Sequence, residues 1–307
     1  MDKKRIFVYL AFTFGVGYAA QFGLLFAGLI AYQKPTVFHT LLLAAIMWIP
    51  ALGALAASLI CPDPGRPMPK VWPLPAGPAL WLMFAVPALF AANYALSSLF
   101  GFVGAQWGLS TLQGQLSPAS LEQIPPNVRP ILPGLLAVFG IAFSVALGAT
   151  VVAAAALGSE LGWRGYLLPR LAGKNRVAVN LVMGLLWGIW ILPLVLWWFR
   201  LRNDYEGVVP TVLCSLGMAV ALGSALNEIV RRTGHVGLAA LALGLFVSQE
   251  RLGLAFWPYL FPSAELPWAG AFSVFGIALW LCAALFPFVL VGKAARGAAA
   301  PTVAEKD

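Results

Sequence analysis

The stretch SELGWRGYLLPRL, from Ser159 to Leu171, places an acid and two arginines in a chain that is otherwise largely apolar. Glu160 and Arg164 stand four residues apart, in the order that favours an ion pair along a helix. Charged side chains are costly at membrane depth, so they normally pair with each other or take part in chemistry. This stretch is therefore the starting point for assigning both the fold and a site.

The composition around this stretch is that of an integral membrane protein. Of the 307 residues, 61% are hydrophobic and only 10% are charged, whereas a soluble domain is nearer half apolar and a quarter charged. Because a membrane-spanning helix needs about 20 apolar residues, the sequence predicts about eight spans. Their ranges are 6–31, 37–60, 77–102, 131–157, 177–199, 210–230, 235–256 and 268–292.

These spans predict an all-α fold, a polytopic membrane helical bundle whose main partner is the lipid bilayer. We expect one transmembrane domain over residues 1–296, followed by a disordered cytosolic tail over residues 297–307, which is small and polar. Most of the 19 basic residues fall on the side that holds both ends of the chain. The positive-inside rule therefore predicts that both termini are cytosolic. The net charge of +8 then faces an anionic membrane leaflet and calls for no nucleic-acid partner.

Three segments resemble the signatures of a known family. The stretch from Ser159 to Leu171 is similar to the pattern E-E-x-x-x-R-G-Y-L-L-P-R-L. The segment GLLWGIWILPL (Gly184–Leu194) is similar to G-L-x-W-G-x-W-H-L-P-L, and RRTGHVGLAALALGLFV (Arg231–Val247) is similar to the approach to a third signature. These patterns are typical of the CPBP family of CAAX prenyl endopeptidase-like intramembrane metalloproteases, also called the Abi or bacteriocin self-immunity family. The resemblance is strongest over residues 130–250, and it implies a CAAX-protease-like fold in a bacterial cytoplasmic membrane.

The resemblance also implies where the catalytic groups of such a protease would stand, and this chain departs from the pattern at each of those positions. The first Glu of the pair is replaced by Ser159, and the His of the second signature by Ile191. The His and Asn of the third signature are replaced by Leu243 and Val247. None of the four replacements can activate water or bind a metal in the way that Glu, His and Asn do.

Glu160 and Arg164 are retained, and by resemblance they are the pair that braces the site. The spacing also makes a geometric prediction. Trp187 lies four residues before Ile191, and Leu243 lies four before Val247, so each pair shares one face of a helix. We therefore expect Ser159, Trp187 and the three apolar replacements to line one cavity near the cytosolic side, with Glu160 and Arg164 as a mainly structural pair.

The cofactor prediction follows from the same substitutions. Family members are thought to use zinc in some cases, and a zinc site needs three or four suitable ligands. The chain has only two histidines, His39 and His235, and His235 stands eight residues before the position at which the pattern expects a ligand. We therefore predict no metal ligands and no cofactor.

Three functions remain open on these grounds. The first is a catalytically impaired member of the family, a pseudo-protease that binds a hydrophobic or prenylated peptide or another membrane protein. The second is an active intramembrane endopeptidase that uses Glu160 as its base. The third is a permease for a small molecule.

Overall fold

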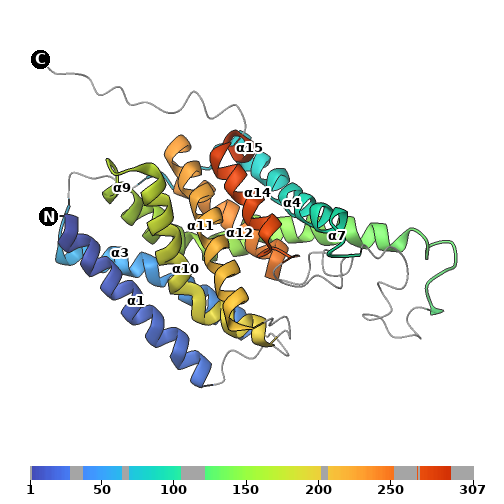
Figure 1. Cartoon of the computed structure of the whole chain (residues 1–307), viewed down its shortest axis with the longest axis horizontal. Coiled ribbons are helices and arrows are strands. Elements are labelled where there is room, and N and C mark those ends of the chain that lie inside the picture. The colour runs from blue at the N-terminus through green and yellow to red at the C-terminus, as the bar shows by residue number, and fades with distance from the viewer. Residues whose placement is uncertain are drawn as a thin grey trace, which may run out of the picture.

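The computed structural model describes residues 2–27, 37–63, 69–104, 122–201, 207–251, 268 and 270–291, and its architecture is helical throughout (Figure 1). The α-helices are α1 (Asp2–Phe26), α2 (Val37–Met47), α3 (Ile49–Ile60), α4 (Ala76–Leu99), α7 (Leu132–Leu147), α8 (Ala153–Glu160), α9 (Leu168–Arg170), α10 (Arg176–Leu201), α11 (Val208–Thr233), α12 (Val236–Arg251), α14 (Val274–Leu285) and α15 (Phe288–Val291). Two π-helical segments, η1 (Gly148–Val152) and η2 (Leu161–Leu167), join α7 to α8 and α8 to α9. The predicted all-α class is confirmed, and the predicted tail over 297–307 lies outside the described residues.

A helix lies in each of the eight predicted ranges. Among the described residues, six helical stretches are long and apolar enough to cross a membrane. The predicted seventh and eighth spans correspond to shorter apolar helices, Val236–Glu250 and Val274–Leu285. The chain is therefore a polytopic helical membrane protein.

The predicted end of the fourth span at residue 157 is wrong. The helix continues without a break through η1, α8 and η2, and the apolar stretch runs from Gly134 to Arg170, 37 residues in all. That is roughly 55 Å of helix, well beyond a hydrocarbon core of about 30 Å. The prediction stopped where the first charges appear, but these charges pair with each other inside the protein and do not end the helix.

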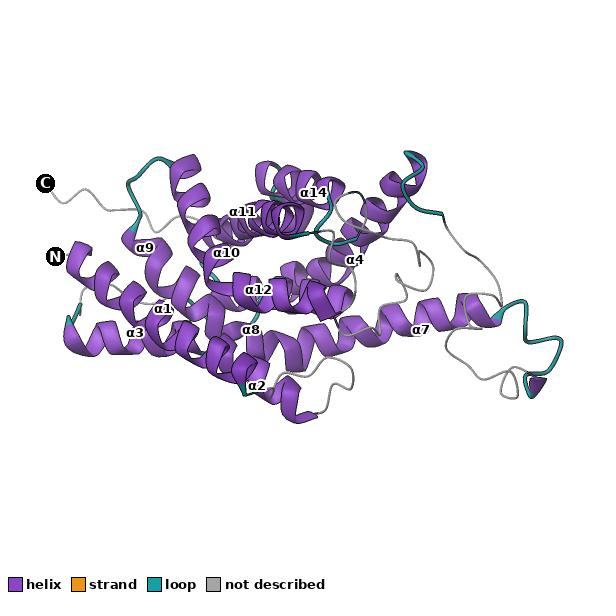
Figure 2. Cartoon of the chain, turned by 60° about the horizontal axis from the view of Figure 1, so that its bottom comes forward, coloured by secondary structure: helices purple, strands orange, loops and turns teal. Residues whose placement is uncertain are grey.

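α12 is the central helix of the bundle. Its residues from Val236 to Phe246 are all buried, and it packs against α4, α7, α8, α11 and η1. Figure 2 shows α12 between α11 on one side and α7 and α8 on the other. Because its neighbours enclose it so fully, the part of the third family-like segment that lies in α12 is in the protein interior.

Two glycines bring α8 and η2 close to the junction between α2 and α3. A Cβ atom on Gly158 would lie 2.6 Å from the Cα atom of Trp48, and one on Gly162 would lie 2.5 Å from backbone atoms of Pro50. Small residues four positions apart allow membrane helices to approach in this way. The close approach places α2 beside Ser159, at the edge of the site described below.

α10 is supported by α1 where a proline interrupts its hydrogen bonding. Pro193 has no N–H, so the carbonyl of Ile189 loses its helical partner. The Tyr18 hydroxyl donates a hydrogen bond to that carbonyl at 2.9 Å, and the Gln21 side chain donates to the carbonyl of Trp190 at 2.9 Å. In a membrane, backbone groups must find partners within the protein, so these bonds hold the second family-like segment in place.

Candidate functional site

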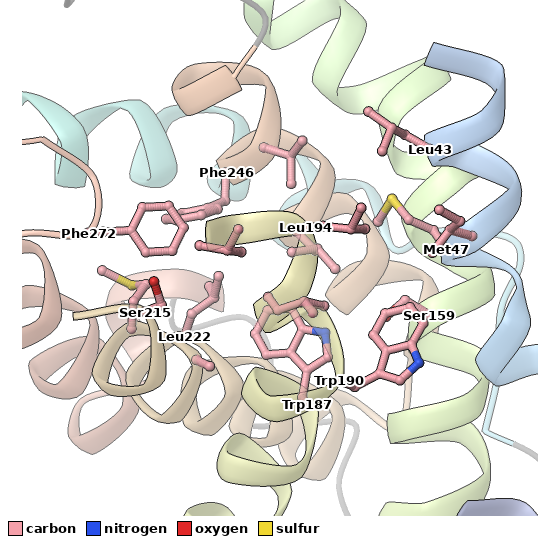
Figure 3. A pocket seen from close by; sticks show the side chains of 17 residues that line it. Leu43, Met47, Ser159, Trp187, Trp190, Leu194, Ser215, Leu222, Phe246 and Phe272 are labelled. Carbon is pink, nitrogen blue, oxygen red and sulfur yellow. The ribbon is translucent and has the colours of Figure 1, made fainter. Parts of the chain in front are cut away.

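Five positions singled out from the sequence lie on the wall of one cavity. Ser159 comes from α8, Trp187 and Ile191 come from α10, and Leu243 and Val247 come from α12 (Figure 3). The cavity has a volume of about 150 Å³. Segments that are far apart in the sequence thus meet at the positions that the family resemblance assigns to catalytic groups.

Further walls of the cavity come from α2, α11 and the residues before α14. Among the described residues that line the cavity, Ser159 and Ser215 are the two that have a hydroxyl, amide or charged side chain, and Ser215 comes from α11. The sequence reasoning missed this wall, although Ser215 is a polar residue within an apolar span. The remaining lining residues are apolar or aromatic: Leu43, Ile46, Met47, Trp190, Leu194, Val195, Met218, Ala219, Leu222, Phe246 and Phe272.

Glu160 and Arg164 form the predicted ion pair away from the cavity wall. The Arg164 Nη1 atom donates to the Glu160 Oε1 atom at 2.8 Å, and both residues are fully buried. The π-helical segment η2 begins directly after Glu160. Neither side chain is among those that line the cavity.

Arg164 makes three further contacts that tie η2 to α10 and α11. Its Nε atom donates to the Asn227 Oδ1 atom at 3.1 Å, and its Nη2 atom donates to the carbonyl of Gly223 at 3.4 Å. Its Cζ atom lies 5.0 Å from the centroid of the Trp187 ring, within the range of a cation–π interaction. Trp187 therefore separates the charged pair from the apolar cavity that it also lines.

The buried pair continues into a polar network at the ends of α10 and α11. The Asn227 amide donates to the Asn180 Oδ1 atom at 3.0 Å, and that atom also accepts from Arg231 Nη1 at 2.8 Å. Glu228 accepts from Arg231 at 2.6 Å, as the spacing of these two residues suggests, and from Arg176 Nε at 2.8 Å. The sequence reasoning missed the two asparagines, whose only signal was an amide within an apolar helix.

The described residues do not fit a metal site. No three His, Cys, Asp or Glu side chains among them gather closely enough to hold a metal ion. His235 is buried, and its Nε2 atom lies 2.8 Å from the carbonyl of Pro73, so it connects the start of α12 to the residues before α4. It is not among the cavity-lining residues, and the side chain of His39 lies outside the described part of the structure. The part of the chain that the structure describes therefore offers no ligand set for the zinc that the family resemblance suggests.

One comparison with known proteins agrees with the resemblance over part of the chain. Residues 140–247 match the family model of the type II CAAX prenyl endopeptidases of the Rce1-like kind. No curated protein matches the chain, and no solved structure does. The matched segment contains Ser159, the Glu160–Arg164 pair and the cavity-lining residues of α10 and α12. Through this segment, which is less than half of the chain, the protein is similar to the Rce1-like type II CAAX prenyl endopeptidases.

Proposed function

We propose that this chain is a non-catalytic member of the family, which retains the fold and the cavity and binds an apolar segment of a membrane peptide. One observation carries the proposal. The four positions at which the resemblance expects Glu, His, His and Asn hold Ser159, Ile191, Leu243 and Val247, and all four line the same cavity. This supports a cavity that is retained from a protease site while the groups that hydrolyse a peptide are replaced.

The chemistry of peptide hydrolysis supports this interpretation. The reaction needs a base to activate water and a donor or metal to stabilise the developing oxyanion. Loss of one such group typically lowers the rate by roughly a hundredfold or more. Aliphatic side chains can neither move a proton nor bind a metal, and a serine hydroxyl is not basic near neutral pH. Because several such groups are missing from one site, we expect little peptidase activity.

Glu160 is poorly placed to replace the missing base. A general base must come within hydrogen-bond reach of the water that it activates. Glu160 is fully buried, its carboxylate is bonded to Arg164, and it is not part of the cavity wall. The position of this side chain favours a structural role over the alternative of an active peptidase.

The cavity is suited to an apolar group of modest size. Apolar cavities of about 150 Å³ remain dry and bind molecules of the size of benzene. Apart from two serines, the described residues that line this cavity are aliphatic residues, methionines and aromatic residues. One leucine- or phenylalanine-sized side chain of a membrane peptide would fill it.

We propose the orientation predicted from the charges, with both termini in the cytosol of a bacterial cell. Two clusters of ion pairs support the assignment of the basic segments to one side of the membrane. Arg5 of α1 and Arg170 of α9 both lie near Asp63, at 3.5 Å and 3.3 Å, and Arg176 and Arg231 both bond Glu228. Each cluster joins segments that the orientation places on the cytosolic side.

Filling the cavity should abolish peptide binding. We expect Ile191→Trp to lower photo-crosslinking of a leucine-rich transmembrane peptide that carries a photoreactive leucine by at least about tenfold, because the indole occupies the binding space. Ile189→Trp is the matched control, since Ile189 lies on the same helix and is exposed outside the cavity. The measurement is the crosslinked yield in lipid nanodiscs, with thermal unfolding to show that both variants fold.

Equal crosslinking of the two variants would show that the peptide binds elsewhere, and the proposed role of the cavity would fail. A peptide that is cleaved rather than retained would support the peptidase alternative. Uptake of a small solute into vesicles, with no peptide crosslinked, would support the permease alternative.

A further inference from the structure

Two buried serines differ from the other buried serines of the described residues. The hydroxyls of Ser159 and Ser215 have no hydrogen-bond partner in the described part of the chain, although both residues are almost fully buried. The other buried serines each donate a hydrogen bond to a nearby oxygen: Ser97 to Asn93, Ser144 to Ile141, Ser224 to Val220, Ser248 to Leu245 and Ser273 to Asn93. The two unpartnered serines are also the two that line the cavity.

This coincidence points to a ligand. A buried hydroxyl without a partner costs free energy, and native structures rarely tolerate one without a reason. A serine in a helix can usually bond a carbonyl one turn earlier, as Ser224 does with Val220 at 2.6 Å. Ser159 and Ser215 make no such bond, and both residues line the cavity.

Water alone does not explain the arrangement. Figure 3 shows Ser159 and Ser215 on opposite sides of the cavity, with apolar and aromatic side chains between them. A buried water molecule needs two to four polar partners, and each end of this cavity offers one hydroxyl. A larger ligand with an apolar body and one polar end needs only one such hydroxyl, and its apolar body fills the rest of the cavity.

We propose that the cavity binds an uncharged, apolar ligand that carries a carbonyl group, and that the serine at the end of the cavity where the carbonyl lies, Ser159 or Ser215, donates a hydrogen bond to the carbonyl oxygen. This inference rests on one part of the proposed function, namely that the cavity binds a ligand. It adds the chemistry of that ligand. The absence of any charged side chain among the described lining residues favours a neutral ligand, because a buried charge needs a partner. The four aromatic lining residues, Trp187, Trp190, Phe246 and Phe272, suit a flat or chain-like apolar body.

Such a carbonyl has two sources in a membrane, the amide of a peptide and the ester of a lipid. Both are neutral acceptors attached to apolar groups, so the cavity chemistry fits either. Two small probes of similar length separate them, N-methylhexanamide for the amide and methyl hexanoate for the ester. The probe whose affinity falls more when both serines are replaced by alanine identifies the source of the carbonyl.

The central test compares acetophenone with ethylbenzene, which have similar shapes and differ in the carbonyl. The affinity of each probe for the protein in nanodiscs is measured by ligand-observed NMR, and the ratio of the two affinities is taken for each variant. We expect the double variant Ser159→Ala/Ser215→Ala to reduce the preference for acetophenone by at least about fivefold. Using the ratio between variants cancels the different partitioning of the probes into lipid.

Ser224→Ala is the matched control, because Ser224 is buried, bonded to Val220 and outside the cavity wall. It should leave the probe preference unchanged and lower the melting temperature, since it loses a hydrogen bond. The double variant at the cavity should not lower the melting temperature, because no hydrogen bond is lost there. This second readout separates ligand recognition from a structural role of the two hydroxyls.

An unchanged preference in the double variant would overturn the inference, and so would a loss of stability in that variant that matches the loss in Ser224→Ala. Failure of this inference can be distinguished from failure of the proposed peptide binding. If the serine dependence holds while no peptide is crosslinked, the cavity takes a small carbonyl compound and the peptide proposal fails. If the peptide is crosslinked without any serine dependence, binding rests on shape alone and this inference fails.

Discussion

Replacement of Arg164 by leucine should lower the free energy of unfolding by about 3–5 kcal/mol, which is the usual cost of removing one partner of a buried ion pair. The variant leaves the buried carboxylate of Glu160 without its partner. It also removes the donors to Asn227 and to the carbonyl of Gly223. The measurement is equilibrium unfolding in mixed micelles.

The remaining variants of this pair test whether the cost comes from the pairing. Glu160→Gln should cost less than Arg164→Leu, because the arginine keeps its bonds to Asn227 and Gly223. The double variant should cost less than the sum of the single variants, since each group stabilises the other. Arg176→Leu is the control: that side chain is 58% exposed, and exposed ion pairs contribute about 1 kcal/mol or less. If Arg164→Leu unfolds like Arg176→Leu, the buried pair is not a structural brace.

Gly244→Ala should destabilise the protein by about 1–3 kcal/mol or more, because the new methyl group has no space. A Cβ atom at this position would lie 2.6 Å from the backbone nitrogen and 2.7 Å from the Cα atom of Ala153, and it would also meet the carbonyl of Gly148. These are backbone atoms, so α12 would have to move away from η1 and α8. Equilibrium unfolding in mixed micelles measures the loss.

Gly15→Ala is the matched control for that variant. Gly15 lies in α1, and apart from the adjacent backbone of its own helix no described atom lies within 4 Å of the position that its Cβ would occupy. Because alanine is the better helix former, this variant should be at least as stable as the parent chain. Similar unfolding of the Gly244 and Gly15 variants would contradict the tight packing of α12 against η1.

The sequence predicted those features that depend on local pattern. The apolar runs predicted the helices, since each run is long enough to span a membrane, and the four-residue spacing predicted that Glu160 and Arg164 would pair. The spacing of Trp187 with Ile191, and of Leu243 with Val247, placed each pair on one helix face. The structure brings these faces to one cavity, and the roles of the residues there remain a proposal.

The features that the sequence did not predict depend on contacts between distant segments. Asn180 and Asn227 bond each other across α10 and α11 at 3.0 Å, and no periodicity in either helix indicates that pairing. Ser215 and Phe272 reach the cavity only because α11 and the residues before α14 pack around it. The helix from Gly134 to Arg170 was predicted too short, because a hydropathy pattern cannot distinguish charges that meet water from charges that meet each other.

The most direct test of the non-catalytic proposal is mass spectrometry of a farnesylated peptide after incubation with the purified protein in lipid nanodiscs. We expect the peptide to remain intact with and without added zinc, because the cavity positions that would carry the base and the oxyanion donor hold Ser159, Ile191, Leu243 and Val247. Cleavage that a chelator inhibits and that Glu160→Ala abolishes would contradict this account.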